Sequence, residues 1–343
     1  MTVSSFIHPG LPGRVRFGVG TVGRVADEVA ALGGTRALLI ATASMTATAR
    51  RLADQLGDRL VAVVDRVVQH VPEELAVAVR RRAVEAGADV VVSLGGGSAT
   101  GLAKAVAVAI GAPIVAVPTT YAGSEVTPVY GITGAHKVTR SDPRAVPRVV
   151  VYDPELTRSL PRRTTATSGL NALAHCVSAV QRPDANPVGE LFAEAGVRRL
   201  AGALPRCAEA PDDLDARGEA LFGAYLAGAA FAIAGAGLHH RLCHVLGGDY
   251  GLVHAEVHAA LLPYTVDGGR GGRIATLLGA ESAPTALYDL AVRLGAPTSL
   301  AAIGLPVEAL DVAATRCAVE PVDRPAIRAL LDAAFHGRRP SPH

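Results

Sequence analysis

The first half of the chain alternates between short β-branched runs and stretches with helical periodicity, and this alternation constrains the fold more than any other feature. The β-branched runs predict strands at 37–41, 60–64, 90–94, 114–117 and 148–152. The stretches between them predict helices at 22–32, 46–56, 72–86 and 100–110. Strands that alternate with helices form βαβ units and a parallel sheet. Continuous apolar runs such as Val90–Leu94 suit strands covered on both faces.

The pattern changes after Asp153 and Pro154. From Arg163 onward the sequence shows helical patterns, interrupted by prolines and glycine clusters, and no convincing strand. At about 150 residues per domain, 343 residues suggest two domains. We therefore expect an α/β domain over residues 1–155 and an all-α domain over residues 156–343.

Composition excludes several classes of protein. Half of the residues are apolar and 19% are charged, which excludes wholesale disorder. A net charge of +2 and 4% aromatic residues give no case for nucleic acid or an anionic membrane as a partner. The most apolar stretch, Ala224 to Ala236, is shorter than the roughly 20 residues of a membrane span. We expect a soluble globular protein.

The cysteines and the first residues bear on the cellular compartment. Cys176, Cys207, Cys243 and Cys317 lie far apart, without the spacing of a zinc site. The first 18 residues have no basic segment followed by an apolar run, so they do not resemble a signal peptide. We therefore expect reduced thiols and a cytoplasmic location.

The clearest local motif is the glycine-rich segment 95–101, between the predicted strand ADVVVSL and the predicted helix TGLAKAVAVAI. Glycines let the backbone approach a ligand closely, and a helix N-terminus attracts an anion. The segment is neither GxGxxG nor a Walker A motif, which argues against ATP hydrolysis. It predicts a phosphate or pyrophosphate site; a tight structural turn is the alternative.

A hydroxyl-rich segment, PTTYAGSEVT at 118–127, follows the next predicted strand. Open α/β sheets bind ligands at the carboxyl ends of their strands, so these hydroxyls suit a cofactor's phosphates, ribose or amide. The alternative is a turn without a ligand. Lys104 lies in the helix after the glycines, where it would meet an anion or remain a solvated surface lysine.

Five histidines fall within 20 residues, and His175 lies upstream. His240 and His244 are four residues apart, as are His254 and His258, so each pair shares a helix face. His239 completes the cluster, which suggests proton chemistry or metal ligation. A hard divalent metal would also need an oxygen ligand, and Asn171 offers only a neutral amide. The case for a metal is weak.

Five segments in order resemble maleylacetate reductases, a branch of the iron-containing alcohol dehydrogenase and dehydroquinate synthase-like group. They are GGGSATGLAKA (95–105), PTTYAGSEVTP (118–128), SGLNALAHCV (168–177), DANP (184–187) and GLHHRLCHVLGGDYGLVHAEVHAALLPY (237–264). The resemblance runs from about Arg16 to Ala334. It implies a Rossmann-like nucleotide-binding domain and a helical domain carrying the catalytic histidines, the dehydroquinate synthase-like fold. It also implies a homodimer with NADH or NADPH bound in the cleft between the domains.

The resemblance also assigns residues. Gly96, Gly97 and Ser98 should hold the pyrophosphate, Thr119, Thr120 and Thr127 should line the cofactor site, and Lys137 should lie near the nicotinamide ribose. Thr42 stands where an Asp would bind the adenosine ribose, so both cofactors remain open. His244 should lie near the nicotinamide as the first catalytic candidate, with His175, His240 and His254 around the substrate. Tyr121, Lys104 and Asn171 are further candidates for substrate contacts.

Asn171 bears on the metal. The wider group has an Asp ligand at this position and three histidine ligands that match His175, His240 and His254. Maleylacetate reductases resemble this chain in carrying Asn there. We therefore expect no required metal, with the histidines used for substrate carboxylates and protons. Lys104 and protonated histidines would supply positive charge to a dianionic substrate.

The implied reaction reduces the C=C bond of maleylacetate to give 3-oxoadipate, in the degradation of aromatic compounds. The chain departs from the family pattern at 136–147, at 249–251 and at 317–325. These departures leave open a related oxidoreductase that acts on another unsaturated or oxo acid, including a biosynthetic one. A metal-dependent alcohol dehydrogenase and a non-catalytic dinucleotide-binding protein are further alternatives.

Overall fold

A computed structural model describes residues 13–134, 136–182, 186–266, 271–318 and 323–341; the side chain of Lys137 is also outside the described part. The chain divides into two compact units. The described residues up to 160 form an α/β unit, and the described residues from 161 onward form a helical unit. Parts of the predicted DANP motif and of the departure at 317–325 lie outside the described residues.

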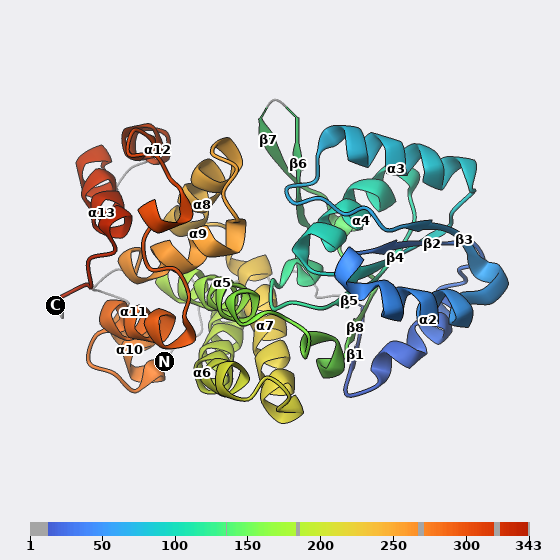
Figure 1. The fold of residues 1–343 in the computed structure, drawn as a ribbon, viewed down its shortest axis with the longest axis horizontal. Coiled ribbons are helices and arrows are strands. Elements are labelled where there is room, and N and C mark those ends of the chain that lie inside the picture. The colour runs from blue at the N-terminus through green and yellow to red at the C-terminus, as the bar shows by residue number, and fades with distance from the viewer. Residues whose placement is uncertain (1–12, 135, 183–185, 267–270, 319–322, 342–343) are drawn as a thin grey trace. The chain divides into compact units, whose positions relative to one another are not determined.

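A six-stranded parallel sheet forms the centre of the α/β unit, in the order β1-β8-β5-β4-β2-β3 (Figure 1). The predicted parallel sheet is confirmed. The strands are β1 (Arg14–Phe17), β2 (Ala37–Ala41), β3 (Leu60–Val64), β4 (Val90–Gly95), β5 (Ile114–Pro118) and β8 (Val149–Tyr152). Five of them match the predicted strands to within a residue at each end.

The helices of this unit are also close to those predicted: α1 (Val25–Ala31), α2 (Thr46–Leu56), α3 (Glu73–Glu85) and α4 (Gly97–Ile110). Helix α1 begins three residues after its predicted start and is preceded by a 3-10 turn at Thr21–Arg24. Helix α4 begins three residues before its predicted start, so Gly97 and Ser98 belong to its first turn.

Three strands are missing from the prediction. Strand β1 alternates arginine with apolar residues because Arg14 and Arg16 both pair with the buried carboxylate of Glu28. Strands β6 (Val129–Thr133) and β7 (Lys137–Ser141) form an antiparallel hairpin. Its residues are largely polar or exposed, so no hydrophobic alternation reveals it.

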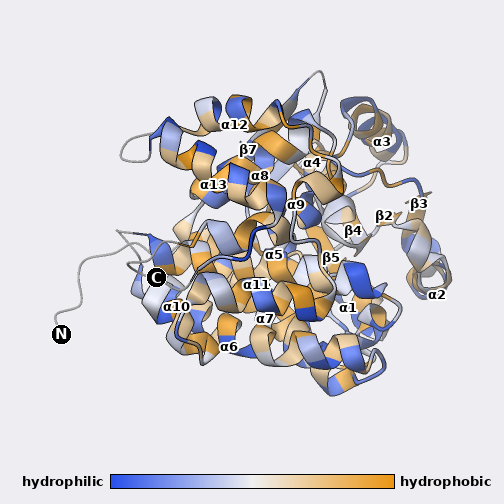
Figure 2. Cartoon of the chain, turned by 60° about the vertical axis from the view of Figure 1, so that its left-hand side comes forward, coloured by the Kyte–Doolittle hydropathy of each residue, from blue (hydrophilic) through white to orange (hydrophobic). Residues whose placement is uncertain are grey.

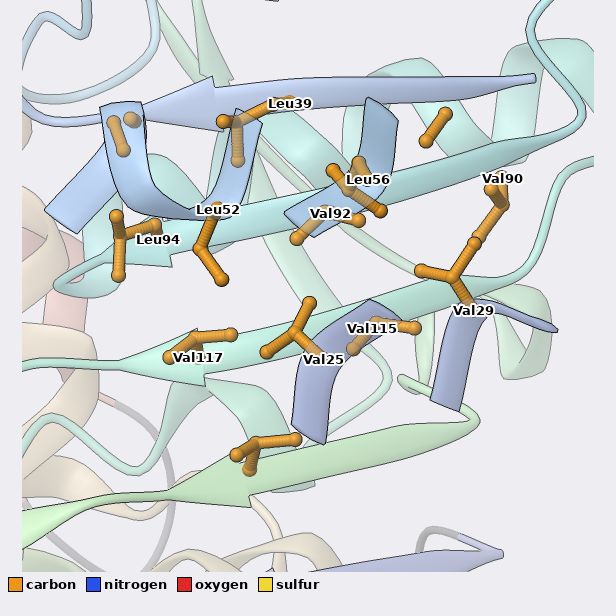
Figure 3. Close-up of a cluster of buried hydrophobic side chains, with 14 of the residues drawn as sticks. Val25, Val29, Leu39, Leu52, Leu56, Val90, Val92, Leu94, Val115 and Val117 are labelled. Atoms are coloured by element: carbon orange, nitrogen blue, oxygen red, sulfur yellow. The ribbon is translucent and has the colours of Figure 1, made fainter. Parts of the chain in front are cut away.

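Valine and leucine side chains build the core on one face of this sheet (Figure 3). Val25 and Val29 of α1 and Leu52 and Leu56 of α2 pack against alternate residues of β2, β4 and β5. Leu39, Val92 and Val115 are among these strand residues and are fully buried. An aliphatic core of this kind accounts for the stability of a domain with few aromatic residues.

The helical unit contains no strand among its described residues, as predicted. Figure 2 shows hydrophilic and hydrophobic residues alternating around outer helices of this unit such as α12. The helices are α5 (Arg162–Gln181), α6 (Pro187–Glu209), α7 (Leu214–Ala234), α8 (Leu238–Asp249), α9 (His254–Leu261), α10 (Gly271–Leu278), α11 (Ala283–Leu294), α12 (Ala309–Cys317) and α13 (Arg324–His336).

Helix α5 is the buried helix of this unit: every residue from Thr165 to Val180 is buried. Glycines bring α5, α6 and α7 close together. A Cβ at Gly169 would lie 2.3 Å from a methyl carbon of Leu204, and one at Gly196 would lie 2.7 Å from Sγ of Cys176. Small residues therefore allow these helices to lie closer together than large side chains would permit.

Among the described residues, no single helix has the length and hydropathy needed to cross a membrane. One bent pair, Leu214–Ala234 with Leu238–Asp249, passes the same test together, by length and composition only, with a bend of 103° between the two helices.

Candidate active site

The glycine segment joins β4 to α4, and its glycines differ in what they contribute. Gly95 has a φ of 153°, and a Cβ there would lie 2.6 Å from Cγ2 of Thr42. A Cβ at Gly96 would lie 2.8 Å from Cγ2 of Thr120. A Cβ at Gly97 would meet only Cβ of Ala122, at an ordinary 3.5 Å. Packing therefore requires the first two glycines, whereas space remains open at Gly97.

The start of α4 is suited to an anion. Gly96 is its N-cap residue, and no side chain among the described residues caps the helix. Its first N–H groups therefore retain their capacity to bind a ligand. Half-buried Ser98 lies in the same turn. A phosphate group fits this chemistry.

Neighbouring strand ends bring several predicted cofactor residues to this segment. The backbone N–H of Thr42, after β2, donates to Leu94 O at 3.0 Å, and that of Thr119, after β5, donates to Gly95 O at 3.0 Å. The side chain of Thr120 lies over Gly96. Strands β2, β4 and β5 are adjacent in the sheet, so Thr42, Gly96, Gly97, Ser98, Thr119 and Thr120 share its carboxyl edge.

Lys104 does not present its charge to a ligand, contrary to our prediction. The side chain is fully buried, and Nζ lies 2.5–3.2 Å from the carbonyl oxygens of Ser124, Thr127 and Val129 and from Oγ1 of Thr127. Burial lowers the pKa of Lys104 to about 7, although the nearby Glu125 opposes this shift. Lys104 therefore anchors the hydroxyl-rich segment.

The predictions for Thr127 and Tyr121 need the same correction. The Thr127 hydroxyl accepts from Lys104 and donates to Ser124 O at 3.1 Å, so it is used within the segment. The Tyr121 ring is fully buried, with its hydroxyl 3.5 Å from that of Thr157. Both side chains hold the segment in shape instead of facing a ligand. Lys137 begins β7, and its side chain lies outside the described residues.

In the helical unit, three helices bring the histidines together, and α8 and α9 pack against each other (Figure 1). Helix α5 supplies Asn171 and His175, one turn apart; α8 supplies His239, His240 and His244; α9 supplies His254 and His258. The His240 ring is centred 5.1 Å from that of His175 and 4.9 Å from that of His258. The predicted cluster is therefore one site.

Phe231 of α7 closes one side of the cluster. Its ring stacks on His175 at 4.6 Å and on His240 at 4.3 Å between centroids. Nδ1 of His240 lies 3.3 Å from the Ser178 hydroxyl. Among the described residues, Nδ1 of His175 and Nε2 of His240 have no hydrogen-bond partner, although both atoms are buried. These nitrogens remain available to a ligand.

Burial determines the charge of these rings. Desolvation lowers the pKa of His175 to about 4 and that of His239 to about 3. The pKa values of His240 and His258 also lie well below the ordinary value, first because of burial and then because of the neighbouring histidines. These four rings are neutral near pH 7, so the expectation that protonated His175 and His240 attract a dianion is wrong. They act as hydrogen-bonding groups.

A row of hydrogen bonds links His239 and His258, to which the sequence assigns no individual role, with His254. Nε2 of His239 lies 2.9 Å from Nδ1 of His258, and Nε2 of His258 lies 3.0 Å from Nε2 of His254. Nδ1 of His239 lies 2.7 Å from the Thr265 hydroxyl. The sequence places His239 and His258 in the cluster, but Thr265 has no recognisable signal because only the fold brings it close.

The donor atoms bear on metal binding. Asn171 supplies an amide oxygen where the wider group has a carboxylate, and Nε2 of His254 is within hydrogen-bond distance of His258. His239, Cys243 and His258 have potential ligand atoms within 4.8 Å of one another. However, two imidazole ligands of one tetrahedral zinc ion would lie about 3.3 Å apart. The 2.9 Å separation of His239 and His258 is that of a hydrogen bond.

Comparison with known proteins places both units in one family. Residues 12–154 match the family model described as iron-containing alcohol dehydrogenase, and residues 165–329 match the C-terminal model of the same family. The chain is 46% identical to the maleylacetate reductase of Burkholderia cepacia, over 99% of this chain and 100% of that one. It is also 46% identical to the enzyme of that name from a Rhizobium species, over 98% and 99%.

Comparison with solved structures supports the same family. The crystal structure of maleylacetate reductase from Agrobacterium tumefaciens superimposes with a TM-score of 0.92 and 42% identity, covering 98% of this chain and all of that one. This likeness confirms the predicted combination of a Rossmann-like domain and an all-α domain. The chain belongs to the iron-containing alcohol dehydrogenase family and, within it, to the maleylacetate reductases.

Proposed function

We propose that the protein reduces the C=C bond of maleylacetate to give 3-oxoadipate, with NADH or NADPH as the hydride donor, in the degradation of aromatic compounds. The observation that carries the proposal is the six-histidine cluster, with Asn171 one helical turn before His175, in a chain that matches maleylacetate reductases over nearly its whole length. An oxidoreductase that reduces a conjugated alkene needs proton donors near its substrate more than it needs a metal ion.

The glycine segment is the proposed cofactor site. When bound there, a reduced nicotinamide dinucleotide would supply hydride. The N–H groups of Gly97 and Ser98 at the start of α4 would bind the pyrophosphate, and Thr120 would limit the space beside it. Thr42, at the end of β2, carries no charge that would repel a 2′-phosphate, so the residues support both NADH and NADPH.

The histidine cluster is the proposed substrate site. Hydride addition to the alkene carbon β to the ketone leaves an enolate, whose oxygen needs a hydrogen-bond donor. Neutral His175 and His240 can provide N–H donors there. His244 is half-buried, and its ring is centred 5.7 Å from that of His254. We assign His244 to protonation of the adjacent carbon, because its ring is less buried than those of His239, His240 and His258 and an imidazole can act as a general acid.

We also propose that no metal is required. A hard divalent ion at His175, His240 and His254 would favour an anionic oxygen donor as its fourth ligand, whereas Asn171 is neutral. It would also have to break the hydrogen bond between His254 and His258. These residues do not fit such an ion, and no step of the proposed reaction uses one.

Compartment and assembly remain proposals. All four cysteines are free and buried, which supports a reducing, cytoplasmic environment. The homodimer rests on the family resemblance alone, and light scattering of the purified protein tests it.

The first experiment follows the loss of nicotinamide absorbance when NADH or NADPH is mixed with fresh maleylacetate, with and without EDTA. We expect rapid oxidation that EDTA does not change. Strong inhibition by EDTA would contradict the metal-free site. If the protein binds the cofactor but oxidises neither NADH nor NADPH, the proposal that maleylacetate is its substrate is wrong.

A substitution at Gly97 tests the cofactor site. Because a Cβ there meets no close atom, Gly97→Ala should not lower the thermal midpoint, whereas it should weaken NADH binding at least about tenfold. Gly97→Val should weaken it further. Gly23→Ala, in the same unit and in open space, is the matched control. Unchanged NADH affinity in both Gly97 variants would exclude this phosphate site.

One observation favours the alternative of a related acid as substrate. Asp249, in the departure from the family pattern at 249–251, pairs with Arg316, which directly precedes the departure at 317–325. A pair of this kind can reshape a pocket wall. In the absorbance assay, faster oxidation with another unsaturated or oxo acid than with maleylacetate would identify that alternative.

A further inference from the structure

A continuous row of hydrogen bonds runs through the histidine cluster and ends at a half-buried residue on each side. It passes from the Thr265 hydroxyl to His239 at 2.7 Å, from His239 to His258 at 2.9 Å, and from His258 to His254 at 3.0 Å. His239 is 6% exposed and His258 is fully buried, whereas Thr265 and His254 are half-buried. The row therefore connects two partly exposed groups through a buried interior.

We propose that Thr265, His239 and His258 form a proton relay that supplies His254. The inference rests on the proposed reduction, which takes up one proton for each hydride transferred. Relay residues act through His254 and need not touch the substrate.

The row can be satisfied in two complete arrangements. In the first, the Thr265 hydroxyl donates to Nδ1 of His239, and each next ring donates from Nε2 towards His254. In the second, every donor is reversed: His254 donates to His258, His258 to His239, and His239 to Thr265. Both are possible for neutral rings because each imidazole carries one N–H and one acceptor nitrogen.

The position of Thr265 makes the reversal possible. When its hydroxyl accepts from His239, its own hydrogen needs another acceptor, and the carbonyl oxygens of Leu261 and Leu262 both lie 3.2 Å from Oγ1. No donor or acceptor in the row is lost in either arrangement. A row that only stabilised the fold would need one direction alone.

Passage from the first arrangement to the second moves one proton. Thr265 passes its proton to Nδ1 of His239 and regains one from water. The Nε2 hydrogen of His239 moves to Nδ1 of His258, and that of His258 moves to Nε2 of His254. His254, now protonated on both nitrogens, releases its Nδ1 hydrogen. The rings must then reorient before the next passage.

In the proposed reaction this proton ends on carbon. Hydride and the proton add to the two alkene carbons, the C=C π bond is consumed, and the reduced nicotinamide is oxidised. The proton reaches the substrate from His254 directly or through His244, whose ring is centred 5.7 Å away. One hydride and one proton are used, so the step balances.

The experiment compares Thr265→Val, which removes the hydroxyl at nearly constant volume, with Thr265→Ser, which keeps it. We expect Thr265→Val to lower kcat about 10–100-fold, to leave KM for maleylacetate unchanged and to enlarge the solvent isotope effect on kcat. Thr265→Ser should restore all three. Thr276→Val, an exposed threonine that also donates to a helix carbonyl, is the matched control.

A second measurement does not depend on turnover. Histidine labelled with an NMR-active nitrogen isotope should show couplings across the N–H···N bonds between His239 and His258 and between His258 and His254. His258→Gln, which keeps a polar side chain that cannot carry protons along the row, should remove both couplings and lower kcat as Thr265→Val does.

The outcomes separate the relay from the proposed function. Absent couplings would overturn the relay, as would equal kcat values for Thr265→Val and Thr265→Ser with no change in isotope effect. Zinc bound by His239, Cys243 and His258, found by elemental analysis, would also overturn it. Failure of the proposed function would appear instead as no turnover by the unaltered enzyme.

Discussion

The two candidate sites are built from different parts of the chain. In the α/β unit, the glycine segment offers main-chain N–H groups at the start of α4, and the polar side chains around it turn inward to hold that backbone. In the helical unit, the site consists of side chains: rings from α5, α8 and α9 that bond to and stack on one another. The first site suits binding, and the second suits proton chemistry.

This difference has a physical origin. A main-chain site needs a fixed backbone, so buried groups such as Lys104 and Glu125 are used for support, and Tyr152 donates to Glu125 at 2.7 Å. A side-chain site needs groups that can change protonation state, so its buried nitrogens face one another. Substitutions in the two sites should therefore affect different steps.

The largest effect expected is that of His244→Ala. Turnover should fall by about 100- to 10,000-fold, the usual contribution of a general acid, while the dissociation constant for NADH stays the same. Stopped-flow turnover and cofactor titration measure the two quantities. His336→Ala, an exposed histidine on α13, is the control. Loss of NADH affinity in His244→Ala would assign His244 to cofactor binding. It would also contradict the assignment of cofactor binding to the α/β unit and of proton transfer to the helical unit.

Sequence reasoning predicts the two sites unequally. The glycine segment is a local pattern, because strand, glycines and helix follow one another, and its residues do meet at the sheet edge. The histidine cluster is also predictable, because five histidines lie within 20 residues of the sequence. The sequence does not show which way each side chain points. Lys104, Thr127 and Tyr121 lie in the segments predicted to bind ligands, but their side chains point into the protein.

The remaining errors have the same cause. Whether a lysine is a ligand or an anchor depends on which carbonyls the fold brings within reach, here those of residues 124–129. Thr265 joins the histidine row from beyond the end of α9, and no spacing rule predicts this contact. The edge strand β1 is missed because Arg14 and Arg16 interrupt its apolar residues, and their pairing with Glu28 is not visible in the sequence.

The second prediction concerns acid. Four buried histidines, His175, His239, His240 and His258, have lowered pKa values, so the unfolded chain binds more protons than the folded one below the ordinary value of 6.5. The free energy of unfolding should therefore fall as pH falls from 6.5 towards 4, by up to about 1.4 kcal/mol per pH unit for each ring.

This instability should be confined to the helical unit. In the α/β unit, burial raises the pKa of Glu125, which has the opposite sign: the folded state binds the extra proton. Amide hydrogen exchange at pH values on either side of 6 should show helices α5, α8 and α9 losing protection before strands β2, β4 and β5. His258→Gln should reduce the pH slope. Loss of protection in both units together would contradict the prediction.

The smallest effect expected follows from Lys104→Met. The substitution keeps the length of the side chain but removes the donor to Ser124, Thr127 and Val129, and it leaves the buried Glu125 without its cation. Leaving buried acceptors without their donor costs about 1–3 kcal/mol, and uptake of a proton by Glu125 should limit any further loss of unfolding free energy. Arg80→Met, at an exposed position on α3, is the control.

The kinetic effect of this change separates an anchor from a ligand. If Lys104 only holds the hydroxyl-rich segment, Lys104→Met should raise KM for the cofactor. The values of kcat at saturation and of KM for maleylacetate should stay within about twofold, because the order of this backbone segment affects cofactor binding alone. Adding Glu125→Gln should recover part of the lost stability, because no buried carboxyl group then remains to be neutralised. A rise in KM for maleylacetate alone would instead indicate that Lys104 binds the substrate. The α/β unit would then contribute a side chain to catalysis as well as main-chain N–H groups.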